Sequence, residues 1–108
     1  MARHNDMPMT QLPVELFTYY APERRLHIEV SDLLGHLHRP AASALPLERI
    51  FNDACDAGLA IRGRREVRRF AFVRTVEGPD EVVGWELAEI DARGSSVQGG
   101  ITLFVVND

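Results

Sequence analysis

Apolar and polar residues alternate with a period of two along much of the chain, which is typical of β-strands with one buried face. The clearest example is residues 26–30, where Leu, Ile and Val alternate with His and Glu. Residues 101–106 are nearly all apolar, which favours an interior strand covered on both faces. The expected strands are residues 14–20, 26–30, 59–61, 67–76, 82–90 and 101–106.

Two turn signals join these strands into hairpins. Residues 21–24 carry Pro22 at the second position of a turn, and residues 78–81 read Gly-Pro-Asp-Glu. In the hairpin of residues 67–76 and 82–90, each strand has a set of apolar side chains on one face, and only one register places both sets on the same side of the sheet. These sets are Phe70, Phe72 and Val76 on the first strand and Val83, Trp85 and Leu87 on the second.

Between residues 46 and 57 the apolar positions change to helical spacing, which predicts the main helix of the chain. Pro46 suits the first helical position, and Gly58 suits the residue after the last turn. A shorter helix is expected at about residues 32–38, with Ser31 as its N-cap. The alternative is that the preceding strand continues to Leu34 and a loop follows.

These elements predict an α+β fold: an antiparallel β-sheet of about five to six strands with the helices on one face. A length of 108 residues indicates one domain, which we place at residues 13–108. Residues 1–12 are expected to be a flexible N-terminal segment.

Composition narrows the function only slightly. The net charge of −4 argues against a dedicated nucleic-acid-binding domain, because such domains are usually basic. All twelve basic residues are Arg, a usage typical of GC-rich bacterial genomes. Cys55 is the single cysteine, so an intramolecular disulfide is excluded. No apolar run has the length of a membrane span and no secretory signal is evident, so we expect a soluble cytoplasmic protein.

Six of the twelve arginines fall between residues 62 and 74. Arg68 and Arg69 are neighbours on a strand, so they point to opposite faces. The predicted register places Arg68 near Glu89 or Asp91 as a cross-strand ion pair. Four other arginines of this segment are candidates for an anion-binding or nucleic-acid-binding site, namely Arg62, Arg64, Arg65 and Arg69.

Histidines and the cysteine give weak signals for metal binding or catalysis. His27, His36 and His38 with Glu29 or Asp32 have no metal-binding spacing, and a helix would direct His36 and His38 apart. Cys55 lies on the apolar face of the predicted main helix, where a free Cys is normally a small buried hydrophobe. We therefore expect no catalytic, cofactor or metal site; a small enzyme using His27, His36 or Cys55 is the least favoured alternative.

Aromatic residues are common anchors of protein interfaces. Tyr19 and Tyr20 are adjacent on a predicted strand and must point to opposite faces, so one of them is expected outside. Trp85 falls on the apolar face of its hairpin, so we expect its side chain in the core; a position in an interface is the alternative. The leading prediction is a small binding protein that acts through protein–protein contacts, with a second copy of itself as one partner, and anion or nucleic-acid binding is the alternative.

Overall fold

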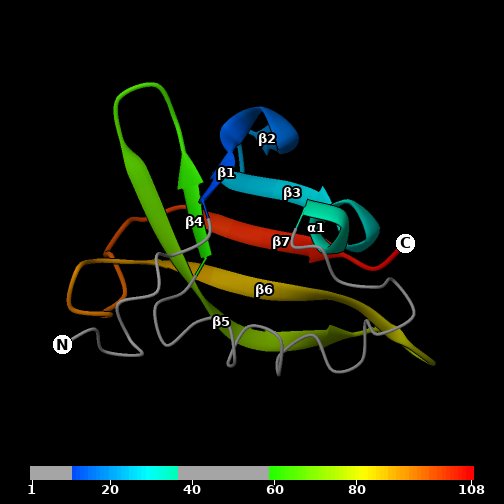
Figure 1. Cartoon of the computed structure of the whole chain (residues 1–108). Coiled ribbons are helices and arrows are strands. Elements are labelled where there is room, and N and C mark those ends of the chain that lie inside the picture. The colour runs from blue at the N-terminus through cyan, green and yellow to red at the C-terminus, as the bar shows by residue number, and fades with distance from the viewer. Residues whose placement is uncertain (1–10, 37–58) are drawn as a thin grey trace, which may run out of the picture.

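The computed structural model describes residues 11–36 and 59–108, which form one curled, seven-stranded β-sheet (Figure 1). The strands are β1 (Gln11–Pro13), β2 (Thr18–Tyr20), β3 (Arg25–Glu29), β4 (Leu59–Arg62), β5 (Val67–Glu77), β6 (Val82–Ile90) and β7 (Thr102–Val106). A short 3₁₀ helix, Val14–Leu16, separates β1 from β2, and the α-helix α1, Val30–His36, follows β3.

The strand order is β1-β4-β5-β6-β7-β3-β2. Strands β4 to β7 are antiparallel neighbours, whereas β1 is parallel to β4 and β3 is parallel to β7. The expected antiparallel sheet of five to six strands is therefore wrong: the sheet is mixed and has seven strands. The parallel contacts join segments far apart in the chain, and local alternation carries no information about such pairing. The predicted main helix, residues 46–57, lies outside the described residues, and within them α1 is the one α-helix.

The predicted strand over residues 14–20 is broken in the structure. Pro13 has a φ of −69°, and the N–H of Phe17 donates to the carbonyl oxygen of Val14 at 3.0 Å, which closes one 3₁₀ turn. Strand β1 therefore joins β4 at one edge of the sheet while β2 joins β3 at the other. Leu12 in β1 is buried, although the sequence placed it in the flexible N-terminal segment.

This break explains the curl of the sheet. The two edge strands are consecutive in the chain, and residues 14–17 are all that separates them. Five peptide steps from Pro13 to Thr18 span at most about 18 Å. The sheet must therefore bend until its opposite edges approach each other, which Figure 1 shows at the side where β1 and β2 lie.

The core lies on the inner face of the curl. Its largest fully buried members come from four neighbouring strands and α1, and they are Leu59, Phe70, Leu87, Leu103, Val105, Leu33 and Leu34. Strand β7 lies between β6 and β3, which confirms the predicted interior position. Its second face is only partly covered, because Thr102, Phe104 and Val106 remain half-buried.

The hairpin of β5 and β6 follows the prediction with one difference. Its turn closes through the N–H of Gly78 and the carbonyl oxygen of Glu81 at 2.7 Å, and Phe72 pairs with Leu87. A β-bulge at Val73 then adds one residue to β5, so Val76 pairs with Gly84 instead of sharing the face of Trp85. A bulge changes which side chains face inward beyond it.

Helix α1 begins at Val30, one residue before the predicted cap. The hydroxyl and the N–H of Ser31 both donate to the carboxylate of Asp108, so Ser31 anchors the last residue of the chain. The buried Leu33 and Leu34 show that this segment is a helix packed on the core, not an extension of β3.

No helix in residues 11–36 or 59–108 is long and apolar enough to cross a membrane.

Replacement by alanine should have opposite effects on stability at Gly84 and at Gly35. A Cβ on Gly84 would lie 2.6 Å from the carbonyl oxygen of Val105 and would collide with the ring of Phe104. We expect Gly84→Ala to lower the free energy of unfolding by about 1–3 kcal/mol, as overpacking usually does.

Gly35 in α1 has open space around its Cβ position. Gly35→Ala should raise stability by up to about 1 kcal/mol. Urea unfolding of both variants checks this, and a Gly84→Ala variant as stable as the wild type would contradict the close approach.

Candidate functional site

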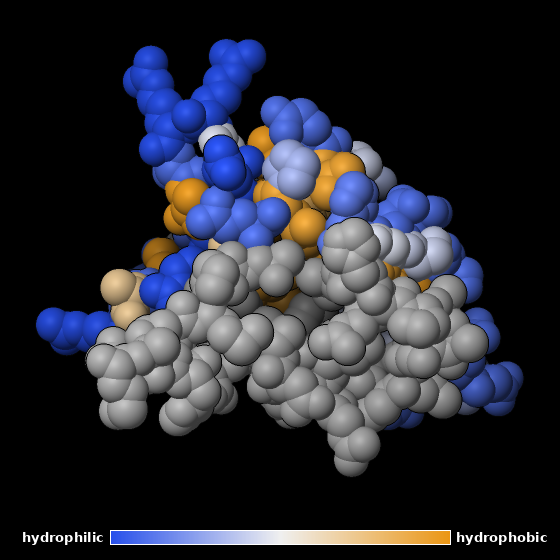
Figure 2. Space-filling model, in the orientation of Figure 1, coloured by the Kyte–Doolittle hydropathy of each residue, from blue (hydrophilic) through white to orange (hydrophobic). Residues whose placement is uncertain are grey.

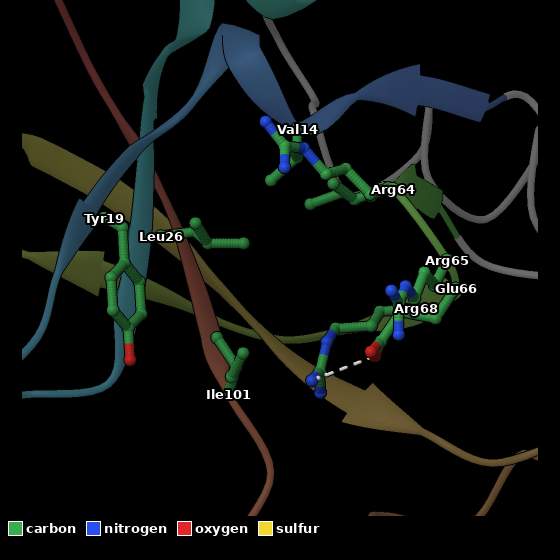
Figure 3. Close-up of a pocket in the computed structure, with 10 residues that line it drawn as sticks. Val14, Tyr19, Leu26, Arg64, Arg65, Glu66, Arg68 and Ile101 are labelled. Carbon is green, nitrogen blue, oxygen red and sulfur yellow. Dashed lines mark ion pairs between the residues drawn. The ribbon is translucent and has the colours of Figure 1, made fainter.

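A cavity of about 540 Å³ opens where the two edges of the curled sheet approach each other (Figure 3). Residues from the 3₁₀ helix, β2, β3, β4, β5 and the segment before β7 line it. The lining consists of Val14, Tyr19, Leu26, Ile61, Gly63, Arg64, Arg65, Glu66, Arg68 and Ile101. We call this the mouth cavity.

The inner part of the mouth cavity is apolar. Leu26 and Ile61 form its floor and are only 4% and 2% exposed. Val14 and Ile101 are half-buried on its walls. Tyr19 pairs with Leu26 across β2 and β3, so its ring shares that face and lies at the rim, 52% exposed. The cavity is thus open to solvent beside Tyr19, while its apolar floor is almost completely buried.

The outer part of the mouth cavity is the turn between β4 and β5. Arg62, the last residue of β4, pairs with Val67, the first residue of β5, and the N–H of Gly63 donates to the carbonyl oxygen of Glu66 at 2.8 Å. This tight turn leaves Arg64 and Arg65 exposed at its tip. Figure 2 shows the hydrophilic projections of this hairpin beside a group of hydrophobic atoms. Arg64 extends toward Val14 across the opening in Figure 3.

Arg68 is held in place by two carboxylates. Its Nη1 atom donates to both oxygens of Glu89 at 3.0 and 3.1 Å, and its Nη2 atom lies 3.0 Å from Oε2 of Glu66. The Glu89 side chain is only 10% exposed and also accepts the N–H of Ile101 at 3.0 Å. The predicted ion pair between Arg68 and Glu89 is confirmed.

Arg64 and Arg65 differ from Arg68 in their electrostatic surroundings. Within the described parts of the chain, neither guanidinium makes an ion pair or a hydrogen bond to a carboxylate. Glu15 lines an adjacent hollow of about 350 Å³ together with Arg62 and Arg64, so its carboxylate lies on the same side of the turn as these two arginines. The rim therefore keeps a local excess of positive charge in a chain whose net charge is −4.

The structure brings three of the sequence-predicted residues together at the mouth cavity, namely Tyr19, Arg64 and Arg65. Arg62 lies beside them at the end of β4. Tyr20 and Arg69 are on the opposite face of their strands from Tyr19 and Arg68. Trp85 is 4% exposed and belongs to the core, so its ring offers no surface to a partner.

Sequence reasoning missed the apolar lining of the cavity. Val14, Leu26, Ile61 and Ile101 have the same pattern as core residues, and only the curl of the sheet leaves space in front of them. Glu66 was also missed as part of the site. Its position in the tight turn, next to four arginines within residues 62–68, was the one available signal.

His27 lies on the outer face of the sheet, away from the mouth cavity. Its ring centroid is 4.3 Å from that of Tyr20 and 5.5 Å from that of Phe104. His36 is exposed at the end of the described part of α1, whereas His38 and Cys55 lie outside the described residues. Residues 11–36 and 59–108 contain no group of three or more His, Cys, Asp or Glu side chains placed to hold a metal ion.

Partial burial and the neighbouring Arg25 lower the pKa of His27 from its usual value of 6.5, against a smaller opposing effect of Glu23. The unfolded chain therefore takes up this proton at a higher pH than the folded protein. Stability should fall as the pH decreases from 7.5 through 6.5 toward the lowered pKa. We expect His27→Phe, which retains an aromatic ring, to lose less stability than the wild type between pH 7.5 and 5.5.

Urea unfolding at the two pH values measures this difference. His36→Gln is the matched control, because His36 is exposed, and it should keep the wild-type pH dependence. Equal pH dependence of His27→Phe and the wild type would contradict the assignment.

Comparison with known proteins adds nothing to this geometry: the chain matches no protein-family model, no curated protein and no solved structure.

Proposed function

We propose that this protein binds a small organic anion in the mouth cavity, through the guanidinium groups of Arg64 and Arg65. The observation that carries the proposal is the position of these two side chains. They carry positive charge without a carboxylate partner among the described residues, at the rim of a cavity with an apolar floor.

The chemistry of the rim supports this proposal. A guanidinium presents a planar set of N–H donors that matches the two oxygens of a carboxylate or phosphate. The volume of about 540 Å³ lies within the range of small-molecule sites, which are usually apolar with a few polar groups. Low-dielectric walls also strengthen the attraction between a bound anion and the rim arginines.

A small ligand is favoured over nucleic acid. A nucleic-acid-binding surface needs a row of cations along the backbone it contacts. Here the exposed arginines that line the cavity lie in one turn, and Glu15 and Glu66 lie close to them. This arrangement suits one anionic group rather than a chain of phosphates.

Replacing the rim arginines should remove most of the affinity for an organic anion. We expect the double variant Arg64→Ser/Arg65→Ser to bind 1-anilinonaphthalene-8-sulfonate at least tenfold more weakly, since each hydrogen bond to a charged group contributes about 1.5–3 kcal/mol. Wild-type binding should also weaken as salt rises. Fluorescence titration measures both effects.

Arg74→Ser is the matched control, because Arg74 pairs with Glu86 at 2.8 Å on the outer face of the sheet. It should bind the dye like the wild type. Equal binding by the double variant and the wild type would refute the proposed anion site.

Self-association, the partner expected from the sequence, is a second candidate. Strand β4 pairs with β5 only as far as Phe70, so the rest of β5 has one neighbouring strand among the described residues. Val73 on this open edge is 51% exposed. An open strand edge can pair with the same edge of a second copy.

A charge on the open edge should prevent this pairing. We expect the wild type to show twice the chain mass at high concentration by light scattering, and Val73→Lys to show the mass of one chain. Val67→Lys is the control, because Val67 is similarly exposed but pairs with Arg62 of β4. A wild type with the mass of one chain at every concentration would exclude this candidate.

A further inference from the structure

We infer that the ligand of the mouth cavity is an amphiphile with a single carboxylate. Its head lies beside Arg64 and Arg65 and displaces Glu66 from Arg68, and its apolar tail lies over Leu26 and Ile61, between Val14 and Ile101. This inference rests on the proposed anion-binding function and names its ligand class. It assigns Glu66 as the residue that occupies the position of the ligand head in the empty protein.

The contact between Glu66 and Arg68 provides the position of the head. Oε2 of Glu66 lies 3.0 Å from Nη2 of Arg68 at the edge of the cavity, as the dashed line in Figure 3 shows. The Glu66 side chain is 57% exposed. Ion pairs of this kind contribute little to stability, so an external carboxylate can replace Glu66 at low cost.

Glu89 keeps Arg68 ready for such an exchange. It binds Nη1 of Arg68 through both oxygens and accepts the N–H of Ile101, and it does so from a nearly buried position. The guanidinium therefore remains in place when Glu66 leaves, with Nη2 available at the cavity. A binding group that is already ordered loses less conformational freedom when the ligand arrives.

The apolar floor provides the site for a tail. Leu26 and Ile61 are recessed behind the arginines, and Val14 and Ile101 flank them. An inorganic anion would contact the rim and leave the partly exposed Val14, Tyr19 and Ile101 facing water. A ligand with an apolar body removes that surface from water, which is favourable.

The charges of the site match one negative group. Three arginines, Arg64, Arg65 and Arg68, face two glutamates, Glu66 and Glu89, which leaves one excess positive charge. Including Arg62 and Glu15 from the adjacent hollow leaves the excess unchanged. A singly charged head therefore neutralises the site, whereas a doubly charged head would leave excess negative charge.

The recessed floor also favours a free amphiphile over a membrane surface. A flat bilayer cannot enter the opening of the cavity, whereas a single chain can lie between Val14 and Ile101 above the buried Leu26 and Ile61. The exposed arginines would contact lipid headgroups without any role for the cavity, so vesicle binding is a separate outcome of the test.

The experiment is isothermal titration of the full chain with acetate, hexanoate, octanoate and decanoate, each below its micelle concentration. We expect affinity to rise by about three- to fourfold for each added methylene, the value for transfer of one CH₂ from water. Glu66→Gln should bind octanoate up to about fivefold more tightly than the wild type, because the competing carboxylate is gone. Glu86→Gln, which alters the ion pair with Arg74 on the outer face, should leave the affinity unchanged.

The other results would separate failure of this inference from failure of the proposed function. Acetate binding as tightly as decanoate, with dependence on Arg64 and Arg65, would overturn the amphiphile and leave anion binding intact. Unchanged or weaker octanoate binding by Glu66→Gln would overturn the exchange at Arg68. Binding of 1-octanol as tight as that of octanoate would overturn the anion site itself. Binding to phosphatidylglycerol vesicles without decanoate binding would overturn the free ligand in favour of a membrane surface.

Discussion

The short connection between β1 and β2 is the constraint on which the rest of the structure depends. Residues 14–17 join two strands that occupy opposite edges of one sheet, and this connection forces those edges together. The curl encloses the core on its inner face, and it leaves a cavity where the edges approach without pairing. A flat sheet with the same strand order would place Tyr19 far from Arg64, and no site would form.

The charges at the mouth cavity follow from the turn between β4 and β5. A four-residue turn cannot bury long side chains, so Arg64 and Arg65 extend into solvent at its tip. Arg68 is two residues into β5 and faces inward, where the nearly buried Glu89 neutralises it. The same arginine-rich stretch therefore contains one cation that Glu89 holds in place and two that have no carboxylate partner among the described residues.

Several local features were predictable because they depend on residues close in sequence. The turn at residues 78–81, the pairing of β5 with β6 and the ion pair of Arg68 with Glu89 follow from turn chemistry and strand alternation. The bulge at Val73 was not predictable, because an extra residue in a strand of alternating apolar residues leaves the pattern almost unchanged. That bulge decides that Val76 faces away from Trp85.

The sequence by itself determined most of the strands and the presence of an arginine-rich turn, because backbone propensity and alternation are local properties. It predicted a short helix after β3 but left an extension of the strand open, and the structure has the helix. Only the tertiary structure decided the parallel pairing of β3 with β7 and of β1 with β4, which brings together segments about 50 to 80 residues apart. It also decided that Leu26 and Ile61, which are buried in the core, form the floor of a cavity. Their apolar character requires burial from water, but it does not specify where a cavity forms, because that depends on how distant segments approach each other.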